Sequence, residues 1–179
     1  MVVVLGFLRQ AMGTMTSPPN MVIVGLAVFL TSFVMAPTFE KSWNDGVQPY
    51  MDGHLDEGEA FDKTMRPLAL FMVHNTRDRD LRLFLDLSRS PEVAKPEDTP
   101  LKALIPAFMI SELRRAFEMG FLIYLPFIII DMVIASVLMS MGMMMIPPAM
   151  VSLPFKLIFF VLVDGWYMVV GSLVQSFSQ

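Results

Sequence analysis

A stretch of 28 residues, Met119–Ile146, constrains the fold most strongly, because Asp131 is its single formal charge. A helix of this length can cross the hydrocarbon core of a bilayer, which is about 30 Å thick. The composition of the whole chain agrees, since 55% of its 179 residues are hydrophobic and only 17% are charged. Soluble domains contain about a quarter charged residues. The sequence therefore predicts an integral membrane protein.

The remaining composition excludes several classes of protein. The 13 basic and 17 acidic residues give a formal charge of −4, and no Lys/Arg cluster offers a surface for nucleic acid. The absence of cysteine excludes disulfides, thiolate metal sites and a cysteine nucleophile. His54 and His74 both lie in polar sequence, away from the methionines that could bind a soft metal. We therefore expect no catalytic residues, no metal and no cofactor.

Apolar segments and helix breakers divide the first third of the chain. Residues 1–12 are apolar but too short to span a bilayer, and they lack the basic start of a signal peptide. They are predicted to be the remnant of a first hydrophobic helix, in a chain that is truncated or begins further upstream. Residues 13–20 are a connector with helix-start signals, and 21–37 is predicted to be a hydrophobic helix ending at Pro37.

A polar region follows at 38–100. The stretch 37–99 holds 8 basic and 13 acidic residues among 63, which is typical of a water-exposed domain. Apolar residues at helical spacing predict two amphipathic helices, one on each side of the charged run Arg77–Asp80. That run is best interpreted as a solvated helix face.

The second half of the chain is predicted to form a helical hairpin. Thr99 and Pro100 are suited to begin a helix at 101–146 that starts charged and becomes apolar. Gly142, Pro147 and Pro148 then break the helix, and a C-terminal hydrophobic helix is expected at 149–175. The fold class is therefore all-α, with membrane-associated hairpins and a polar helical insertion.

Methionines gather at the bend of this hairpin. Six of the 18 methionines fall within twelve positions: Met139, Met141, Met143, Met144, Met145 and Met150. Methionine is unbranched and polarizable, so a ring of such side chains from several subunits could close a pore and still yield to a polypeptide. From the residues alone, the plainer interpretation of methionine as apolar filler is favoured. The segment 143–148 is a candidate methionine loop.

Three charges interrupt the apolar sequence: Asp131, Lys156 and Asp164. Each is expected to need a partner or water, because a lone charge in a membrane costs about 3 kcal/mol or more. Lys156 and Asp164 do not face each other on one helix, so the partner of Lys156 should lie on another helix or another subunit. Glu112 is one candidate, and snorkelling of Lys156 to the membrane edge is the alternative. A proton relay is less favoured, because no histidine lies in these segments.

Four stretches carry a family resemblance: FLRQAMGTMTSPPN (7–20), SELRRAFEMGF (111–121), PFIIIDMVIASVLMSMGMMMIPP (126–148) and LPFKLIFFVLVDGW (153–166). They closely resemble the FliP family of flagellar biosynthetic proteins, which is shared with the inner-membrane R component of virulence type III secretion systems. The resemblance extends over essentially the whole chain. Family members carry a signal sequence and most of a further helix before the first residue seen here.

The resemblance implies a subunit of the flagellar protein export gate. Five copies would assemble with FliR-like and FliQ-like subunits, near FlhB-like and FlhA-like components, in the bacterial inner membrane at the flagellar basal body. Unfolded flagellar proteins would pass through the channel, and residues 38–100 would face the periplasm. Met143, Met144 and Met145 would form a channel gasket, and Glu112 and Lys156 would pair between subunits. The protein itself would catalyse no reaction.

Two alternatives remain at this point. One is the equivalent subunit of a virulence injectisome. The other, less favoured, is a proton or solute transporter that uses the intramembrane carboxylates of Asp131 and Asp164.

Overall fold

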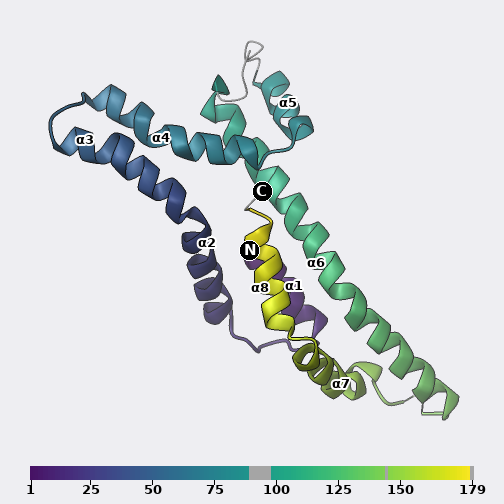
Figure 1. Cartoon of the computed structure of the whole chain (residues 1–179). Helices are drawn as coiled ribbons and strands as arrows, with labels where there is room; N and C mark the ends of the chain where they lie inside the picture. Colours follow the sequence, from purple (N-terminus) through teal and green to yellow (C-terminus); the bar gives the residue numbers. More distant parts are fainter. Residues whose placement is uncertain (89–97, 144, 178–179) are drawn as a thin grey trace. The chain divides into compact units, whose positions relative to one another are not determined.

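Helices make up the regular structure of the computed structural model, which describes residues 1–88, 98–143 and 145–177 (Figure 1). They are α1 (Val2–Ala11), α2 (Asn20–Ser42), the π-helix η1 (Trp43–Val47), α3 (Gln48–Met51), α4 (Glu57–His74), α5 (Asp78–Leu87), α6 (Leu101–Ser140), α7 (Pro148–Leu162) and α8 (Gly165–Gln175). Within those described ranges there is no strand. The predicted all-α class is confirmed.

The chain divides into two compact units. The apolar unit comprises Met1–Thr31 and Ala116–Gln179, and the polar unit comprises Ser32–Arg115. The helices α2 and α6 each contribute residues to both units.

The apolar unit is built around side chains at helical spacing. Val4, Leu8 and Ala11 of α1 follow an i, i+4, i+7 pattern, as do Ile23, Ala27 and Leu30 of α2. The other helices add Ala116 and Phe127 of α6, Phe160 of α7, and Val169 and Leu173 of α8 to this core. In a membrane such helices associate chiefly through close packing, because lipid is as apolar as the side chains.

A small residue allows one such close approach. A Cβ on Gly120 of α6 would lie only 2.8 Å from Cγ of Phe7 on α1. The ring of Phe7 also meets the ring of Phe117 edge to face, at 5.3 Å between centroids. Glycine is therefore required at position 120 for α1 to pack where it does.

Two helical stretches are long and apolar enough to cross a membrane, Asn20–Met51 and Leu101–Ser140. The helices α7 and α8 reach that length only as a pair, and they are bent by 63° relative to each other. The predicted single helix at 149–175 is therefore interrupted after Leu162. Asp164 adopts a left-handed conformation with φ of 51°, and a Cβ on Gly165 would lie 2.8 Å from Cγ of Phe160.

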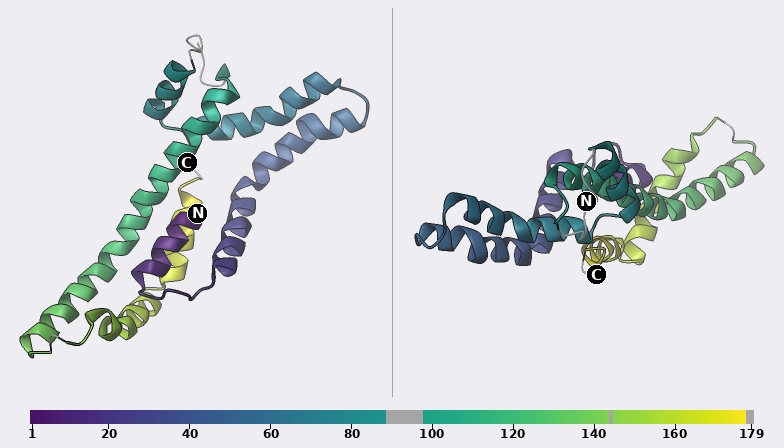
Figure 2. Two further views of the ribbon diagram at one scale, coloured as in Figure 1. Left: turned by 180° about the vertical axis from the view of Figure 1, so that it is seen from behind. Right: turned by 90° about the horizontal axis from the view of Figure 1, so that it is seen from above.

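The first long helix also differs from its predicted bounds, because α2 runs past Pro37 to Ser42 and continues as η1 and α3. A proline inside a helix removes one hydrogen bond, and packing elsewhere can outweigh that loss. In the polar unit η1 and α3 form one continuous helical stretch, and α4 lies beside it (Figure 2). Gly46 of η1 permits this contact, since a Cβ there would lie 2.6 Å from the backbone nitrogen of Thr64.

Candidate functional site

The methionine loop begins at a helix end that the sequence specifies. The N–H of Met143 donates to the carbonyl of Leu138 at 2.9 Å, and the N–H of Gly142 donates to the carbonyl of Met139 at 3.1 Å. These two bonds form a Schellman motif, which needs a left-handed residue after the helix. Gly142 supplies it with φ of 74°, and open space surrounds the position where its Cβ would be. Backbone conformation, and not crowding, therefore requires glycine at position 142.

Two prolines define the other end of the loop. Pro147 is extended, with φ of −62° and ψ of 118°, and Pro148 is the first residue of α7. Proline suits this first position, because its missing N–H would have had no partner within the helix. The predicted turn residues Gly142, Pro147 and Pro148 thus lie at the two ends of the loop.

The side chains of the loop are accessible. Met145 is 98% exposed, and Met143 is also exposed within the single chain. Met144, the third predicted gasket residue, lies outside the described residues. The neighbours Met139, Met141 and Met150 are exposed as well, so exposed apolar side chains gather at the bend.

An ion pair joins the two helices that flank the loop. Nζ of Lys156 on α7 lies 2.6 Å from Oδ2 of Asp131 on α6. The hydroxyl of Ser152 on α7 donates to Oδ1 of the same carboxylate at 2.5 Å. Both carboxylate oxygens are therefore engaged. A Cβ on Gly13 would lie 3.9 Å from Nζ of Lys156, so the connector between α1 and α2 also reaches this site.

This cluster is stable only while its members remain paired. Lys156 and Ser152 are buried, whereas the side chain of Asp131 is 37% exposed. Removing one partner from a buried pair typically costs about 3–5 kcal/mol, and the exposure of Asp131 favours the lower end of that range. The ion pair therefore links α6 to α7 beside the methionine loop.

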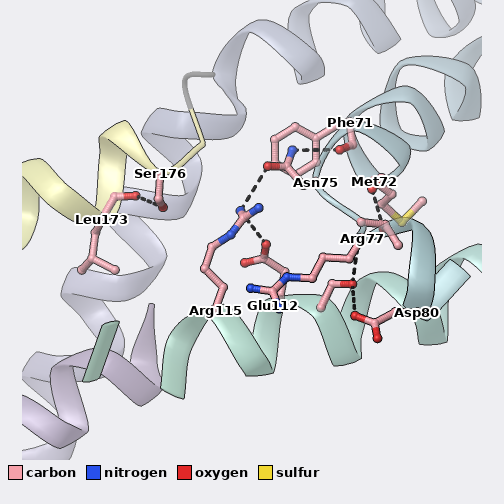
Figure 3. A network of polar contacts seen from close by, with 11 residues as sticks. Phe71, Met72, Asn75, Arg77, Asp80, Glu112, Arg115, Leu173 and Ser176 are labelled. Carbon is pink, nitrogen blue, oxygen red and sulfur yellow. Dashed lines mark hydrogen bonds and ion pairs between the residues drawn. The ribbon is translucent and has the colours of Figure 1, made fainter. Parts of the chain in front are cut away.

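Glu112 has a partner within the polar unit. Nη1 of Arg115 lies 2.9 Å from Oε1 of Glu112 and donates to Oδ1 of Asn75 at 3.2 Å (Figure 3). The side-chain N–H of Asn75 donates to the carbonyl of Phe71 at 2.9 Å. The charged start of α6 is thereby joined to the end of α4.

A second polar contact of the same unit involves Ser111, one residue earlier on α6. Its hydroxyl donates to Oδ2 of Asp80 at 2.7 Å and accepts a hydrogen bond from the backbone N–H of Arg77 at 3.1 Å. Asp80 and Ser111 are both buried. The charged run Arg77–Asp80 is therefore more than a solvated face, because one of its carboxylates is buried against α6.

The charged residues singled out in the sequence have different partners in the structure. Lys156 pairs with Asp131 of its own chain, and Glu112 pairs with Arg115. A Glu112–Lys156 pair between two copies stays a prediction. Asp164 is exposed and is the N-cap residue before α8, but its side chain makes no capping hydrogen bond. Among the described residues no group of three or more His, Asp and Glu side chains could hold a metal ion.

Sequence reasoning missed the partner of Lys156 and the role of Ser152. Two signals were available. Asp131 lies thirteen residues before Met144 and Lys156 lies twelve after it, so a hairpin bent there brings the two charges to the same level. Ser152 and Lys156 are four residues apart and share one face of a helix.

The structure thus has two helices long and apolar enough to span a membrane and a bent apolar pair, with an ion pair that joins α6 to α7. This is the architecture of a polytopic helical membrane protein. The pattern of the FliP family matches residues 1–173. The chain belongs to the FliP family, and the resemblance seen in the sequence is confirmed.

Individual members of the family are similar to this chain over nearly its whole length. The flagellar biosynthetic protein FliP of Caulobacter vibrioides is 57% identical over 178 residues, which cover 99% of this chain and 67% of that protein. The FliP of Rhizobium meliloti is 52% identical over 98% of this chain and 73% of its own length. The FliP of Bacillus subtilis is 52% identical over 98% of this chain and 80% of its own length.

Proposed function

We propose that this protein is a core subunit of the flagellar type III protein export gate in the bacterial inner membrane. Five copies assemble with FliQ-like and FliR-like subunits, next to FlhB-like and FlhA-like components, around a channel for unfolded flagellar proteins. Residues 38–100 face the periplasm. The subunit is a passive conduit and catalyses no reaction.

Membership of the FliP family is the observation that carries this proposal, because the match extends over residues 1–173. The relatives reported above are named as flagellar proteins, which favours the flagellum over an injectisome. Both carboxylate oxygens of Asp131 contact Lys156 and Ser152 of the same chain, so this carboxylate serves to join α6 to α7.

The methionine loop supports the gasket part of the proposal. Flexible thioether side chains at the end of α6 can meet those of neighbouring copies, exclude water at rest and move aside for a polypeptide. The Schellman turn at Gly142 and the prolines at 147 and 148 hold the backbone on both sides of the loop. Closure therefore depends on side chains rather than on movement of the helices.

The gasket is tested by replacing Met143, Met144 and Met145 together with alanine in the assembled complex. Shorter side chains should leave the ring open, so ion conductance of the membrane should rise more than export falls. Met15 and Met21 are exposed methionines outside the loop, and alanine at both positions is the control. Unchanged conductance in the loop variant would overturn the gasket.

The assembly is tested by the native mass of the full chain, purified in mild detergent after co-expression with FliR-like and FliQ-like neighbours. The proposal requires an assembly that contains five copies of this chain. A monomer or simple dimer under these conditions would exclude a methionine ring.

A further inference from the structure

The charge of Lys156 is compensated inside its own chain. Its Nζ lies 2.6 Å from Oδ2 of Asp131 on α6, and Ser152, one turn earlier on α7, donates to Oδ1 of the same carboxylate. Only 4% of Lys156 is exposed, and the connector between α1 and α2 lies against it at Gly13. Neighbouring copies could only add to this burial. The ammonium group is therefore enclosed and paired already in the single chain.

The helix α7 is poorly suited to enter a membrane by itself. It has 15 residues, which span about 22 Å, whereas the hydrocarbon core is about 30 Å thick. It reaches spanning length only together with α8, across a bend of 63°. Lys156 lies near the middle of α7, where an unpaired charge strongly disfavours transfer into lipid. The helix α6, with 40 residues, is long and apolar enough to cross without such help.

We propose that α6 and the bent pair of α7 and α8 enter the membrane as one hairpin, and that Asp131 makes this possible by neutralising Lys156 during insertion. Membrane helices are inserted before they associate with other subunits. The carboxylates of neighbouring copies are therefore not yet within reach, and the partner of the lysine must come from the same chain. The inference is independent of the channel and of its methionine seal.

The order of the elements favours insertion of this hairpin as a unit. The helix α6 comes first and carries the carboxylate, and α7 follows after the short loop 141–147. The turn at Gly142 and the proline at the start of α7 fix the two ends of that loop. Ser152 and Lys156 lie on one face of α7, because they are four residues apart. Both therefore meet the carboxylate as soon as the hairpin closes.

The experiment follows the crossing of α7 and α8 in the full chain. The chain is synthesised without other subunits in a cell-free system that contains inverted inner-membrane vesicles. It has no cysteine, so Met145→Cys, or a cysteine added after Gln179, provides a single thiol for a membrane-impermeant maleimide. The two thiols should lie on opposite sides of the membrane when α7 and α8 have crossed, and on the same side when they have not.

Two variants test the role of the charge. Asp131→Asn keeps the size of the side chain but leaves the lysine without a counter-charge, so the crossed fraction should fall severalfold. Adding Lys156→Met removes the charge and keeps a long apolar side chain, so the crossed fraction should return to that of the native chain. Such restoration separates compensation of charge from a structural need for the carboxylate.

The matched control is Asp164→Asn, which removes the only other acidic side chain that follows Asp131 in the sequence. Asparagine tolerates the left-handed conformation of position 164, so the crossed fraction should stay unchanged. Full crossing of the Asp131→Asn variant would overturn the proposal. A double variant that crosses as poorly as Asp131→Asn alone would also overturn it. The same conclusion would follow if both thiols of the native chain were on one side.

Discussion

At the residue scale, the cluster of Asp131, Ser152 and Lys156 shows how a membrane helix hairpin tolerates charge. The lysine and both carboxylate oxygens are engaged, so no member of the pair is left without compensation. Charges inside a membrane are tolerated when they pair in this way. The hydroxyl of Ser152 is the neutral member of the cluster and can be removed without adding a charge.

Replacing Ser152 with alanine should destabilise the protein by about 2 kcal/mol, because hydrogen bonds to charged groups contribute about 1.5–3 kcal/mol. The thermal unfolding midpoint in mild detergent measures the change. Ser136→Ala is the control, since the hydroxyl of Ser136 is exposed and donates to the carbonyl of Met132 in its own helix. Equal midpoints for the two variants would show that the contact with Asp131 contributes little.

Gly142→Ala tests the turn that begins the methionine loop. A left-handed conformation costs a residue with a Cβ about 1–2 kcal/mol, so this variant should unfold at a lower temperature. Gly171→Ala in α8 is the matched control for Gly142→Ala. A Cβ at position 171 would also meet open space, but the backbone there is helical. Gly171→Ala should be neutral or slightly stabilising. A result in which both variants behave alike would contradict the strained-turn account.

Sequence reasoning succeeded for these residues where a local rule applied. Gly142, Pro147 and Pro148 mark the ends of the loop, because a positive φ and a proline are properties of one position. The partner of Lys156 was not predictable in the same way. Pairing across a hairpin depends on how two helices lie against each other, and Glu112 was as plausible on charge alone as Asp131.

At the element scale, helix ends were predicted less well than helix positions. Pro37 does not end the first long helix, because a single lost hydrogen bond does not end a helix whose continuation is packed. The interruption between α7 and α8 is not predicted from the sequence. It follows from the left-handed Asp164 and from the close contact of Gly165 with Phe160, and neither is visible as an interruption of the apolar sequence.

The contact between η1 and α4 accounts for the continuation of α2, and Gly46→Ala tests it. The added Cβ would overlap Thr64, whose backbone nitrogen and Cα would lie at 2.6 and 2.8 Å. Backbone atoms cannot move aside as a side chain can, so overpacking should cost about 1–3 kcal/mol. Gly58→Ala in α4, where a Cβ meets open space, is the control for thermal unfolding. Similar stability of both variants would contradict this packing.

At the scale of the whole molecule, the all-α membrane class and the family could both be predicted from the sequence. Length, hydropathy and long motifs do not depend on precise packing. The division into an apolar and a polar unit agrees with the change in composition near residue 37 only approximately. The boundaries fall at Thr31 and Arg115, inside α2 and α6, because a continuous helix can serve two cores. In the proposed assembly of several copies, the charges of this chain would have further partners to choose from.

Charge exchange distinguishes the two possible partners of Lys156 in the assembled complex. If Asp131 is the partner, Lys156→Asp should reduce the amount of complex, and adding Asp131→Lys should partly restore it. If Glu112 of a neighbouring copy is the partner, Lys156→Glu should be rescued by Glu112→Lys instead. Native mass and yield after co-expression with the neighbouring subunits measure the outcome.

Because Asp131 holds Lys156 at 2.6 Å within one chain, we expect the first exchange to restore more complex than the second. In the second exchange Lys156→Glu would place two carboxylates side by side in a buried site, which is strongly unfavourable. Rescue by the second exchange alone would mean that Lys156 changes partner on assembly, and that the pair within the chain belongs to the unassembled subunit.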